Sequence, residues 1–346
     1  MSSKEKTTGK IGLTNIGNTC FMNSAIQCLI HIPEFRDIFL NIKNLNKGEE
    51  TEVAFNWTKL VRALWDEEET VISVRPITFY TSFCKYIFKK GLDQFRGYGQ
   101  NDVQEFIVLL LDILHESMKK RCVININGKI QNEEDQCAYD AASSWKSYFQ
   151  NGYSKVISNF YGQLKSGIID CNSGKVLSNS YDPICHFNLP IPDMEILESD
   201  DILPDIYDCF ELFCEEEELE DSFKYKNKEY RVKKKIDVWK FPTLLMITFK
   251  RFDMMLRKNS QKIDFPIKNL DLTKFCSSYT HNSPRKFDLV GVCNHSGNLR
   301  GGHYYAYSLC HDDKWRQFND KYVSDISVEN IVTDAAYVLF YRAQMN

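Results

Sequence analysis

The sequence lacks several features that would place it in other classes of protein. It has no stretch of about eighteen consecutive apolar residues, the length that a membrane-spanning helix needs. Basic residues do not exceed acidic ones: 43 Lys and Arg stand against 47 Asp and Glu, whereas general nucleic-acid binders show a basic excess. The first ten residues are polar and contain no apolar core of a signal peptide. We therefore expect an intracellular protein that binds neither membrane nor nucleic acid.

Cysteine is plentiful, with twelve residues, but its spacing excludes the usual zinc motifs. No Cys-x-x-Cys pair occurs, and Cys209 with Cys214 comes closest. Spread over a chain of 346 residues, these cysteines are typical of reduced thiols rather than of the disulfide framework of a small secreted domain. We expect no structural zinc site and no cofactor.

The length of the chain allows a large core and exceeds one typical domain, so two or three lobes are expected. Apolar residues recur at helical spacing in the first third, over 54–65, 77–88 and, most clearly, 101–118. Near Gly162 the pattern changes to that of strands. The sequence therefore predicts an α+β fold with a helical lobe, a β-ribbon extension and a β-sheet lobe.

The remaining segments differ in character. Residues 122–139 are polar and aperiodic, which indicates a loop, and 141–160 are expected to form one or two short helices. The acidic stretch 194–221 is interpreted as an exposed connection with one helix at 206–213, and a binding role for it stays open. The continuous apolar run 244–249 predicts a buried central strand. The other expected strands are 163–170, 175–189, 223–225, 229–232, 235–239, 287–293, 303–309, 315–318 and 337–341.

One cysteine stands out by its context. Residues 12–24 are rich in small and amide side chains and lead into an apolar segment that ends at Pro33. Asn18 and Thr19 are natural N-caps, so Cys20 is expected in the first turn of a helix. Unpaired backbone N–H groups and the helix dipole favour the thiolate there. Cys20 is therefore a candidate nucleophile, and a buried structural cysteine at a helix start is the alternative.

A cysteine nucleophile needs a base and a group that stabilises the oxyanion. Asn15 can aim its amide at an oxyanion formed on attack by the Cys20 sulfur. His303 is the best base, because it follows an expected flexible loop at 295–302 and lies beside two glycines, Gly301 and Gly302. Glycines at that place let a substrate backbone approach closely.

An amide and a carboxylate follow His303 by one hairpin. Asn319 and Asp320 end the next expected strand, and antiparallel pairing can make them neighbours of His303. Either one can accept the Nδ1–H of His303 and fix the tautomer that pairs with Cys20. The order Cys, His, Asn/Asp is that of papain-like proteases, while a simple turn at 319–320 is the alternative.

The helix at 101–118 also has a polar side. Asn101 with Gln104, and Asp102 with Glu105, both fit a capping box at its start. The acidic side chains then lie opposite the apolar face. A solvated surface and a binding surface are both compatible with this pattern.

Five segments resemble the ubiquitin-specific proteases and occur in that family's order, covering about residues 11–342. These segments are the Cys20 motif, 99–106, 160–163, 248–252 and the motif around His303. The resemblance implies one catalytic domain at 11–346 with a papain-like fold, after a polar tail at 1–10. Its expected parts are a helical thumb at about 11–150, β-ribbon fingers at about 155–243 and a β-sheet palm at about 244–342.

The resemblance implies a deubiquitinating cysteine protease that hydrolyses the peptide or isopeptide bond at the C-terminal glycine of ubiquitin. It makes Cys20 the nucleophile, His303 the general base, Asn319 the third triad member with Asp320 beside it, and Asn15 the oxyanion residue. Residues 253–261 and 295–302 match two blocking loops that admit the ubiquitin tail. The residues expected to contact that tail are Gln100, Asp102, Glu105, His295, Gly301, Gly302 and Tyr304. The expected partners are ubiquitin or ubiquitinated proteins, and the chain is expected to act as a monomer.

One departure from the family concerns the fingertips, where many members bind zinc through two Cys-x-x-Cys pairs. Here Cys171 stands at the first position and Gly174 replaces its partner, while 225–234 contain no cysteine. We expect strand pairing and apolar contacts to hold the fingers instead. Two alternatives stay open: an inactive ubiquitin-binding scaffold, and a protease for a ubiquitin-like modifier.

Overall fold

The computed structural model describes residues 9–65, 71–92, 95, 99–193, 203–253, 255, 257–277, 279–280, 283–298 and 301–344. Its helices are α1 (Cys20–Ile30), α2 (Pro33–Asn41), α3 (Thr51–Trp65), α4 (Ile77–Lys90), α5 (Val103–Met118), α6 (Glu133–Phe149), α7 (Lys155–Phe160) and α8 (Ile206–Cys214). Its strands are β1 (Gly12–Leu13), β2 (Ser73–Val74), β3 (Gly162–Asp170), β4 (Val176–Ile184), β5 (Phe187–Leu189), β6 (Glu217–Glu218), β7 (Phe223–Tyr225), β8 (Lys228–Tyr230), β9 (Val232–Lys240), β10 (Leu244–Phe249), β11 (Leu270–Asp271), β12 (Lys286–Asn298), β13 (Gly301–Leu309), β14 (Trp315–Asn319), β15 (Tyr322–Asp325) and β16 (Ala336–Ala343).

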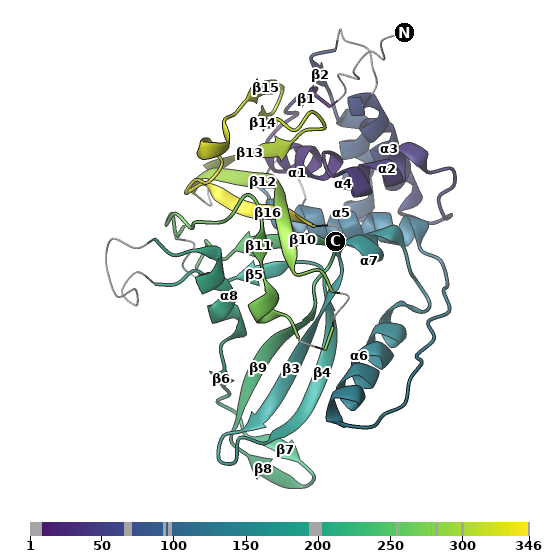
Figure 1. Ribbon diagram of the computed structural model, residues 1–346. Helices are drawn as coiled ribbons and strands as arrows, with labels where there is room; N and C mark the ends of the chain where they lie inside the picture. The colour runs from purple at the N-terminus through teal and green to yellow at the C-terminus, as the bar shows by residue number, and fades with distance from the viewer. Residues whose placement is uncertain are drawn as a thin grey trace.

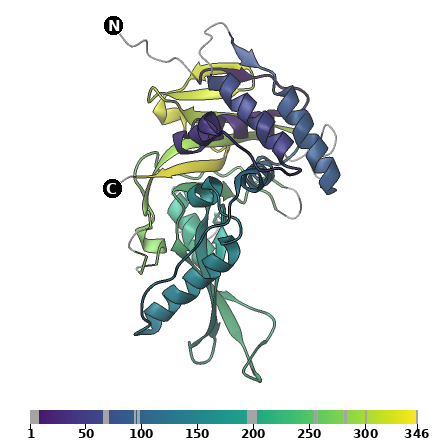
Figure 2. The ribbon, with the colours of Figure 1, turned by 90° about the vertical axis from the view of Figure 1, so that its right-hand side faces the viewer.

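The elements form a helical lobe, a large sheet and a ribbon that projects away from both (Figure 1). The large sheet has the order β15-β14-β13-β12-β16-β10-β5, with β11 paired to β12. A second sheet, β4-β3-β9-β6, forms the ribbon, and the β7–β8 hairpin lies at its far tip (Figures 1 and 2). This confirms the three-part layout and the change from helices to strands near Gly162.

Helix α1 lies at the centre of the helical lobe, against strands β12 and β13 and helix α5. All of its residues are buried, including the polar side chains of Asn23, Ser24 and Gln27. The helix ends at Ile30, and Pro33 opens α2 rather than only ending α1. Proline suits the first position of a helix because its missing N–H would have no partner there.

Strand β10 is buried along its whole length between β16 and β5, as its apolar run predicts. The segment predicted as one strand at 175–189 is two strands in different sheets. Strand β4 lies at the edge of the ribbon, where Pro183 costs no ladder hydrogen bond, and β5 turns into the large sheet and pairs with β10.

Two predicted loops are wrong in part: residues 122–132 form a loop as expected, but 133–139 are helical. Helix α6 begins at Glu133, inside the expected loop at 122–139, because Asn132 accepts a hydrogen bond from the Asp135 backbone at 2.8 Å. Acidic residues fill the first turn of α6, where they suit the helix dipole. The expected flexible loop at 295–302 is mostly strand: β12 continues to Asn298 and β13 begins at Gly301.

None of the helices in the described part of the chain is long and apolar enough to cross a membrane.

Candidate active site

The loop before α1 is shaped by its own small residues. Gly17 and Asn18 have positive φ angles of 117° and 49°, which turn the chain back toward Cys20. Thr19 takes the N-cap position without capping through its side chain; its hydroxyl oxygen instead accepts from the Ile16 N–H at 3.0 Å. Cys20 is the first residue of the helix, as the sequence predicts, and is buried.

The amide of Asn15 is fixed at both ends. Its Oδ1 accepts from the backbone N–H groups of Gly17 and Thr19 at 3.1 and 3.2 Å. Its Nδ2 donates to Asp320 Oδ2 at 3.0 Å. An amide nitrogen carries two hydrogens, so one N–H of Asn15 is held by Asp320 and the other is the donor to assign to an oxyanion.

Asp320 binds a second amide that sequence reasoning missed. Asn23, three residues after Cys20 in α1, donates from Nδ2 to Asp320 Oδ1 at 2.8 Å and is buried. The Asp320 carbonyl also accepts from the Leu13 N–H at 2.9 Å. A signal for Asn23 was present in the sequence, because an amide stands there within the first two turns of a mostly apolar helix.

His303 and Asn319 are brought together by the pairing of β13 with β14. Asn319 Oδ1 accepts from His303 Nε2 at 2.7 Å. This confirms the predicted contact but corrects the nitrogen, since Nε2 rather than Nδ1 meets the amide. The other ring nitrogen is then left for Cys20. A hydrogen bond with the Cys20 side chain raises the pKa of His303 to about 9, against the opposing effect of burial, and the bond to Asn319 adds to the rise.

This arrangement can perform nucleophilic catalysis. A cysteine at a helix start shares a hydrogen bond with a histidine whose other ring nitrogen is oriented by an amide. The raised pKa of His303 favours the imidazolium, which can pair with a thiolate and later protonate a leaving group. Asn319, and not Asp320, is the residue seen to accept a hydrogen bond from His303. The carboxylate of Asp320 accepts hydrogen bonds from the side-chain amides of Asn15 and Asn23 instead.

The predicted acidic surface on α5 is only partly available to a ligand. Asp102 is the N-cap, and its Oδ1 accepts from the N–H groups of Gln104 and Glu105 at 2.7 and 3.2 Å. Its Oδ2 accepts from the Tyr337 hydroxyl at 2.6 Å, a contact that the sequence did not predict. Gln100 and Glu105 are exposed as whole residues. Partial burial of the Glu105 carboxyl group raises its pKa, and repulsion from the charge of Asp102 adds to the rise.

His295 lies within a strand and is packed among aromatic rings. It is 3% exposed, with the rings of Tyr304 and Phe252 centred 4.6 and 5.7 Å from its own. Burial, followed by repulsion from cations nearby, lowers its pKa to about 4, so it is neutral at physiological pH. Tyr304 is buried as well, so the structure does not place either side chain on an open surface.

The two glycines before His303 have different environments. A Cβ on Gly302 would lie 2.0 Å from His295 Nε2, whereas a Cβ on Gly301 would meet nothing within 4 Å. The absence of a side chain at Gly302 therefore accommodates the His295 ring of this chain. A close approach of a substrate backbone, the predicted reason for these glycines, is sterically open at Gly301.

Two cations that sequence reasoning missed tie the segment 251–261 to the sheet. Arg251 is 1% exposed and donates to the carbonyl oxygens of Ala336, Asn259 and Gln261 at 2.7, 3.0 and 2.8 Å. Lys258 Nζ donates to the carbonyl oxygen of His295 at 2.6 Å. The described parts of the two expected blocking loops are therefore joined by a direct hydrogen bond.

Comparison with known proteins agrees with the family resemblance over nearly the whole chain. The model of the family described as "Ubiquitin carboxyl-terminal hydrolase" matches residues 11–341. This protein belongs to that family.

Relatives and solved structures agree with this membership. Human ubiquitin carboxyl-terminal hydrolase 21 is 32% identical over 97% of this chain and 62% of its own length. Human ubiquitin carboxyl-terminal hydrolase 2 is 33% identical over 99% of this chain and 56% of its own length. The chain thus spans less than two thirds of these curated relatives. A chain of the SAGA Ubp8/Sgf11/Sus1/Sgf73 DUB module bound to ubiquitin aldehyde matches with a TM-score of 0.73 and 26% identity, over 99% of this chain and 71% of that chain. The fold is the papain-like fold of the family, with a helical thumb, a β-sheet palm and β-ribbon fingers.

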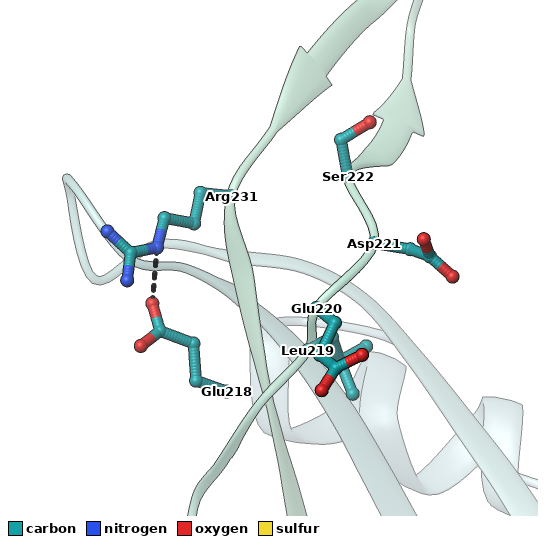
Figure 3. Close-up of a pocket in the computed structure, with 6 residues that line it drawn as sticks. All are labelled: Glu218, Leu219, Glu220, Asp221, Ser222 and Arg231. Atoms are coloured by element: carbon teal, nitrogen blue, oxygen red, sulfur yellow. Dashed lines mark ion pairs between the residues drawn. The ribbon is translucent and has the colours of Figure 1, made fainter.

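The fingertip of this family member combines strand pairing with largely exposed ion pairs. Glu218 lies beside the Arg231 guanidinium at 2.5 Å, at the rim of an open hollow of about 420 Å³ that Figure 3 shows. The thiol of Cys171 is 3.6 Å from the same carboxylate, and Glu216 pairs with Lys233. No group of three or more His, Cys, Asp or Glu side chains in the described residues is arranged to hold a metal ion. The described end of the acidic stretch, 203–221, is thus partly neutralised by strand β9; residues 194–202 lie outside the described chain.

Proposed function

We propose that this chain is a deubiquitinating cysteine protease that hydrolyses the amide bond at the C-terminal glycine of ubiquitin. The observation that carries the proposal is the chain of contacts from Cys20 through His303 to Asn319, with its 2.7 Å hydrogen bond. Family membership supports it, and the similar structure of a DUB module bound to ubiquitin aldehyde supports ubiquitin as the bound modifier.

In the proposed reaction, the Cys20 thiolate attacks the carbonyl carbon of the last glycine, and a C–S bond forms. The carbonyl oxygen takes up the negative charge, which the second N–H of Asn15 and the backbone N–H groups at the start of α1 stabilise. The C–N bond then breaks while the His303 imidazolium gives its proton to the leaving amine. His303 next takes a proton from water, whose oxygen attacks the thioester and releases Cys20.

Substrate recognition is assigned to the cleft between thumb and palm. The basic tail of ubiquitin is expected to pass the exposed carboxylate of Glu105, where opposite charges favour binding. Gln100, Asp102, Gly301 and the surroundings of His295 complete the proposed path. We assign residues 11–346 to one catalytic domain.

Two further properties belong to the same proposal. The candidate catalytic side chains all come from one chain, which supports activity as a monomer. The twelve cysteines are free thiols, which supports an intracellular, reducing location.

The experiment that tests the proposal is incubation with ubiquitin bearing an electrophile at its C-terminus, followed by mass mapping of the adduct. We expect one adduct, on Cys20, that forms much more slowly in His303→Ala. Binding of ubiquitin without an adduct would identify an inactive scaffold. An adduct with a ubiquitin-like modifier but not with ubiquitin would contradict the choice of substrate.

A further inference from the structure

The start of α5 is tied to the palm sheet at two places. Asp102, its N-cap, accepts from the hydroxyl of Tyr337 in β16 at 2.6 Å. Gln104, the second residue of the helix, places its Nε2 at 3.3 Å from Nε2 of His186, which immediately precedes β5. Strands β16 and β5 flank β10 on its two sides. The contact of Gln104 with His186 has no part in the proposed reaction steps.

The polarity of this contact follows from the two groups that make it. An amide nitrogen can only donate, so the facing nitrogen of His186 accepts and carries no proton. The proton of the neutral imidazole is then on Nδ1, which lies 3.6 Å from the sulfur of Cys185. Burial raises the pKa of Cys185 to about 11, so this neighbour is a thiol and not an anion. The neutral His186 therefore offers Gln104 an acceptor.

Because the amide nitrogen of Gln104 is turned to His186, its carbonyl oxygen is left for another donor. Within the part of the chain that the structure describes, this oxygen has no hydrogen-bond partner, and Gln104 is half-buried. It stands in the same helical turn as Glu105, beside which the ubiquitin tail is proposed to pass. The backbone of such a tail offers N–H donors, and an acceptor that is already oriented binds them with less loss of entropy.

We propose that His186 is a positioning residue for ubiquitin recognition: it holds the Gln104 amide so that the carbonyl oxygen accepts a backbone N–H of the ubiquitin tail. This inference rests on the proposed function. Protonation of His186 puts a hydrogen on the nitrogen that faces Gln104, so the amide reverses and turns its NH₂ group toward the tail. A donor then meets a donor, and ubiquitin binds more weakly.

This protonation takes place on the acid side of neutrality. Burial lowers the pKa of His186 below its ordinary value of 6.5. The titratable side chains beside this contact are Cys185, Tyr161, which bonds to the Cys185 thiol, and Asp112, whose charge acts on both. Burial raises the pKa values of Cys185 and Tyr161, so both are uncharged near neutral pH. The affinity for ubiquitin is therefore expected to fall as the pH drops through the pKa of His186.

Steady-state kinetics with ubiquitin–aminomethylcoumarin test the positioning role. His186→Phe removes the acceptor and is expected to raise KM about fivefold while kcat stays within about twofold. His186→Gln keeps an acceptor near the same place and is expected to restore the wild-type KM at neutral pH. His311→Phe is the control, because His311 is exposed in the turn between β13 and β14, at the far end of these strands from His303.

A double-mutant cycle shows whether His186 acts through Gln104. Gln104→Ala removes the amide that His186 orients, so Gln104→Ala/His186→Phe is expected to have the KM of Gln104→Ala alone. Additive increases in KM, or a normal KM in His186→Phe, would overturn the inference and leave the proposed function intact.

The pH dependence of binding separates a reversed amide from a merely structural contact. Protonated His186 still bonds to the reversed amide of Gln104, so a structural contact alone predicts no loss of affinity in acid. In calorimetry with free ubiquitin and the Cys20→Ala chain, we expect Kd to rise about fivefold as the pH falls from about 7 to about 5. Addition of His186→Gln, which does not titrate, should abolish most of this rise.

An equal rise in the two chains would contradict the role of His186, and so would a Kd that does not depend on pH in either. Absence of coumarin release by the wild-type chain would instead overturn the proposed function itself.

Discussion

Asn15 donates a hydrogen bond to Asp320 across 3.0 Å, and this contact joins the loop before the candidate nucleophile to the turn after β14. The two residues are 305 positions apart in the chain. The contact assigns different tasks to two neighbours: Asn319 orients His303, and Asp320 orients the proposed oxyanion donor. Both residues are therefore expected to affect catalysis, through different atoms.

Asp320→Ala is expected to lower kcat by about 100-fold, since removal of one oxyanion-hole donor costs roughly 10²–10³ in other enzymes and Asp320 acts through such a donor. The change leaves the Asn15 and Asn23 amides without their shared acceptor. Steady-state kinetics with ubiquitin–aminomethylcoumarin measure the effect, and KM is expected to change little. Asp313→Ala is the matched control, because Asp313 and Asp320 both have a positive φ, 57° and 51°, in turns of the same sheet. A normal kcat in Asp320→Ala would contradict this role.

The pH dependence of kcat for hydrolysis of ubiquitin–aminomethylcoumarin tests the role of His303. Its pKa is raised to about 9, chiefly by the hydrogen bond with Cys20, so the imidazolium persists below that pH and is lost as the pH rises through it. We expect the rate to fall on the basic side near pH 9. Asn319→Ala removes the acceptor at 2.7 Å, which lowers the pKa, so the basic limb should move to lower pH. An unshifted limb in Asn319→Ala would show that Asn319 does not stabilise the imidazolium.

The fit between Gly302 and His295 predicts a mutation pair with a built-in control. Gly302→Ala places a Cβ 2.0 Å from His295 Nε2 and is expected to lower the free energy of unfolding by about 1–3 kcal/mol, the usual cost of overpacking. Gly301→Ala, with open space around it, should stay within about 0.5 kcal/mol of the wild-type chain.

Denaturant unfolding measures both changes. Adding His295→Ala to Gly302→Ala should recover stability relative to the sum of the single changes, because the clash is then relieved. Strict additivity of the two substitutions would mean that the side chain at 295 and the backbone at 302 do not share this space.

Lys258→Met is expected to raise KM about tenfold while kcat stays within about twofold, because it removes a hydrogen bond that positions substrate-binding segments rather than reacting atoms. The bond from Lys258 Nζ to the His295 carbonyl, at 2.6 Å, joins the two segments on either side of the proposed tail path. Titration of ubiquitin–aminomethylcoumarin gives both constants. Lys268→Met removes an exposed lysine that pairs with Asp288 and serves as the control. A lowered kcat with normal KM would argue for a direct effect on the reacting groups.

The sequence predicted the elements that depend on local chemistry. Cys20 begins a helix because a turn of small and amide residues precedes a mostly apolar run, and both features can be recognised from neighbouring residues in the sequence. Strand β10 was predicted because a continuous apolar run has one stable place, in the middle of a covered sheet. The meeting of His303 with Asn319 followed from one hairpin between them.

The features that the sequence missed depend on residues distant in the chain. Nothing local shows that Tyr337 bonds to Asp102, or that Lys258 reaches the His295 carbonyl. The extension of β12 and β13 into the expected loop at 295–302 arises from pairing between the two strands, which the residues of that segment do not reveal by themselves. The start of α6 could have been read from Asn132 and the acidic residues after it, which form an ordinary N-terminal signal.

The position of β16 has a consequence for how the protein is made. This strand, at residues 336–343, inserts between β12 and β10, so the sheet that carries His303 and Asn319 is split until β16 arrives. A ribosome synthesises β10 and β12 long before β16, and each then presents an unpaired edge that is prone to aggregation. We therefore expect the sheet to close only after residue 343 has left the ribosomal tunnel. Until then the nascent chain, although Cys20 has already been synthesised, should be inactive and dependent on chaperones.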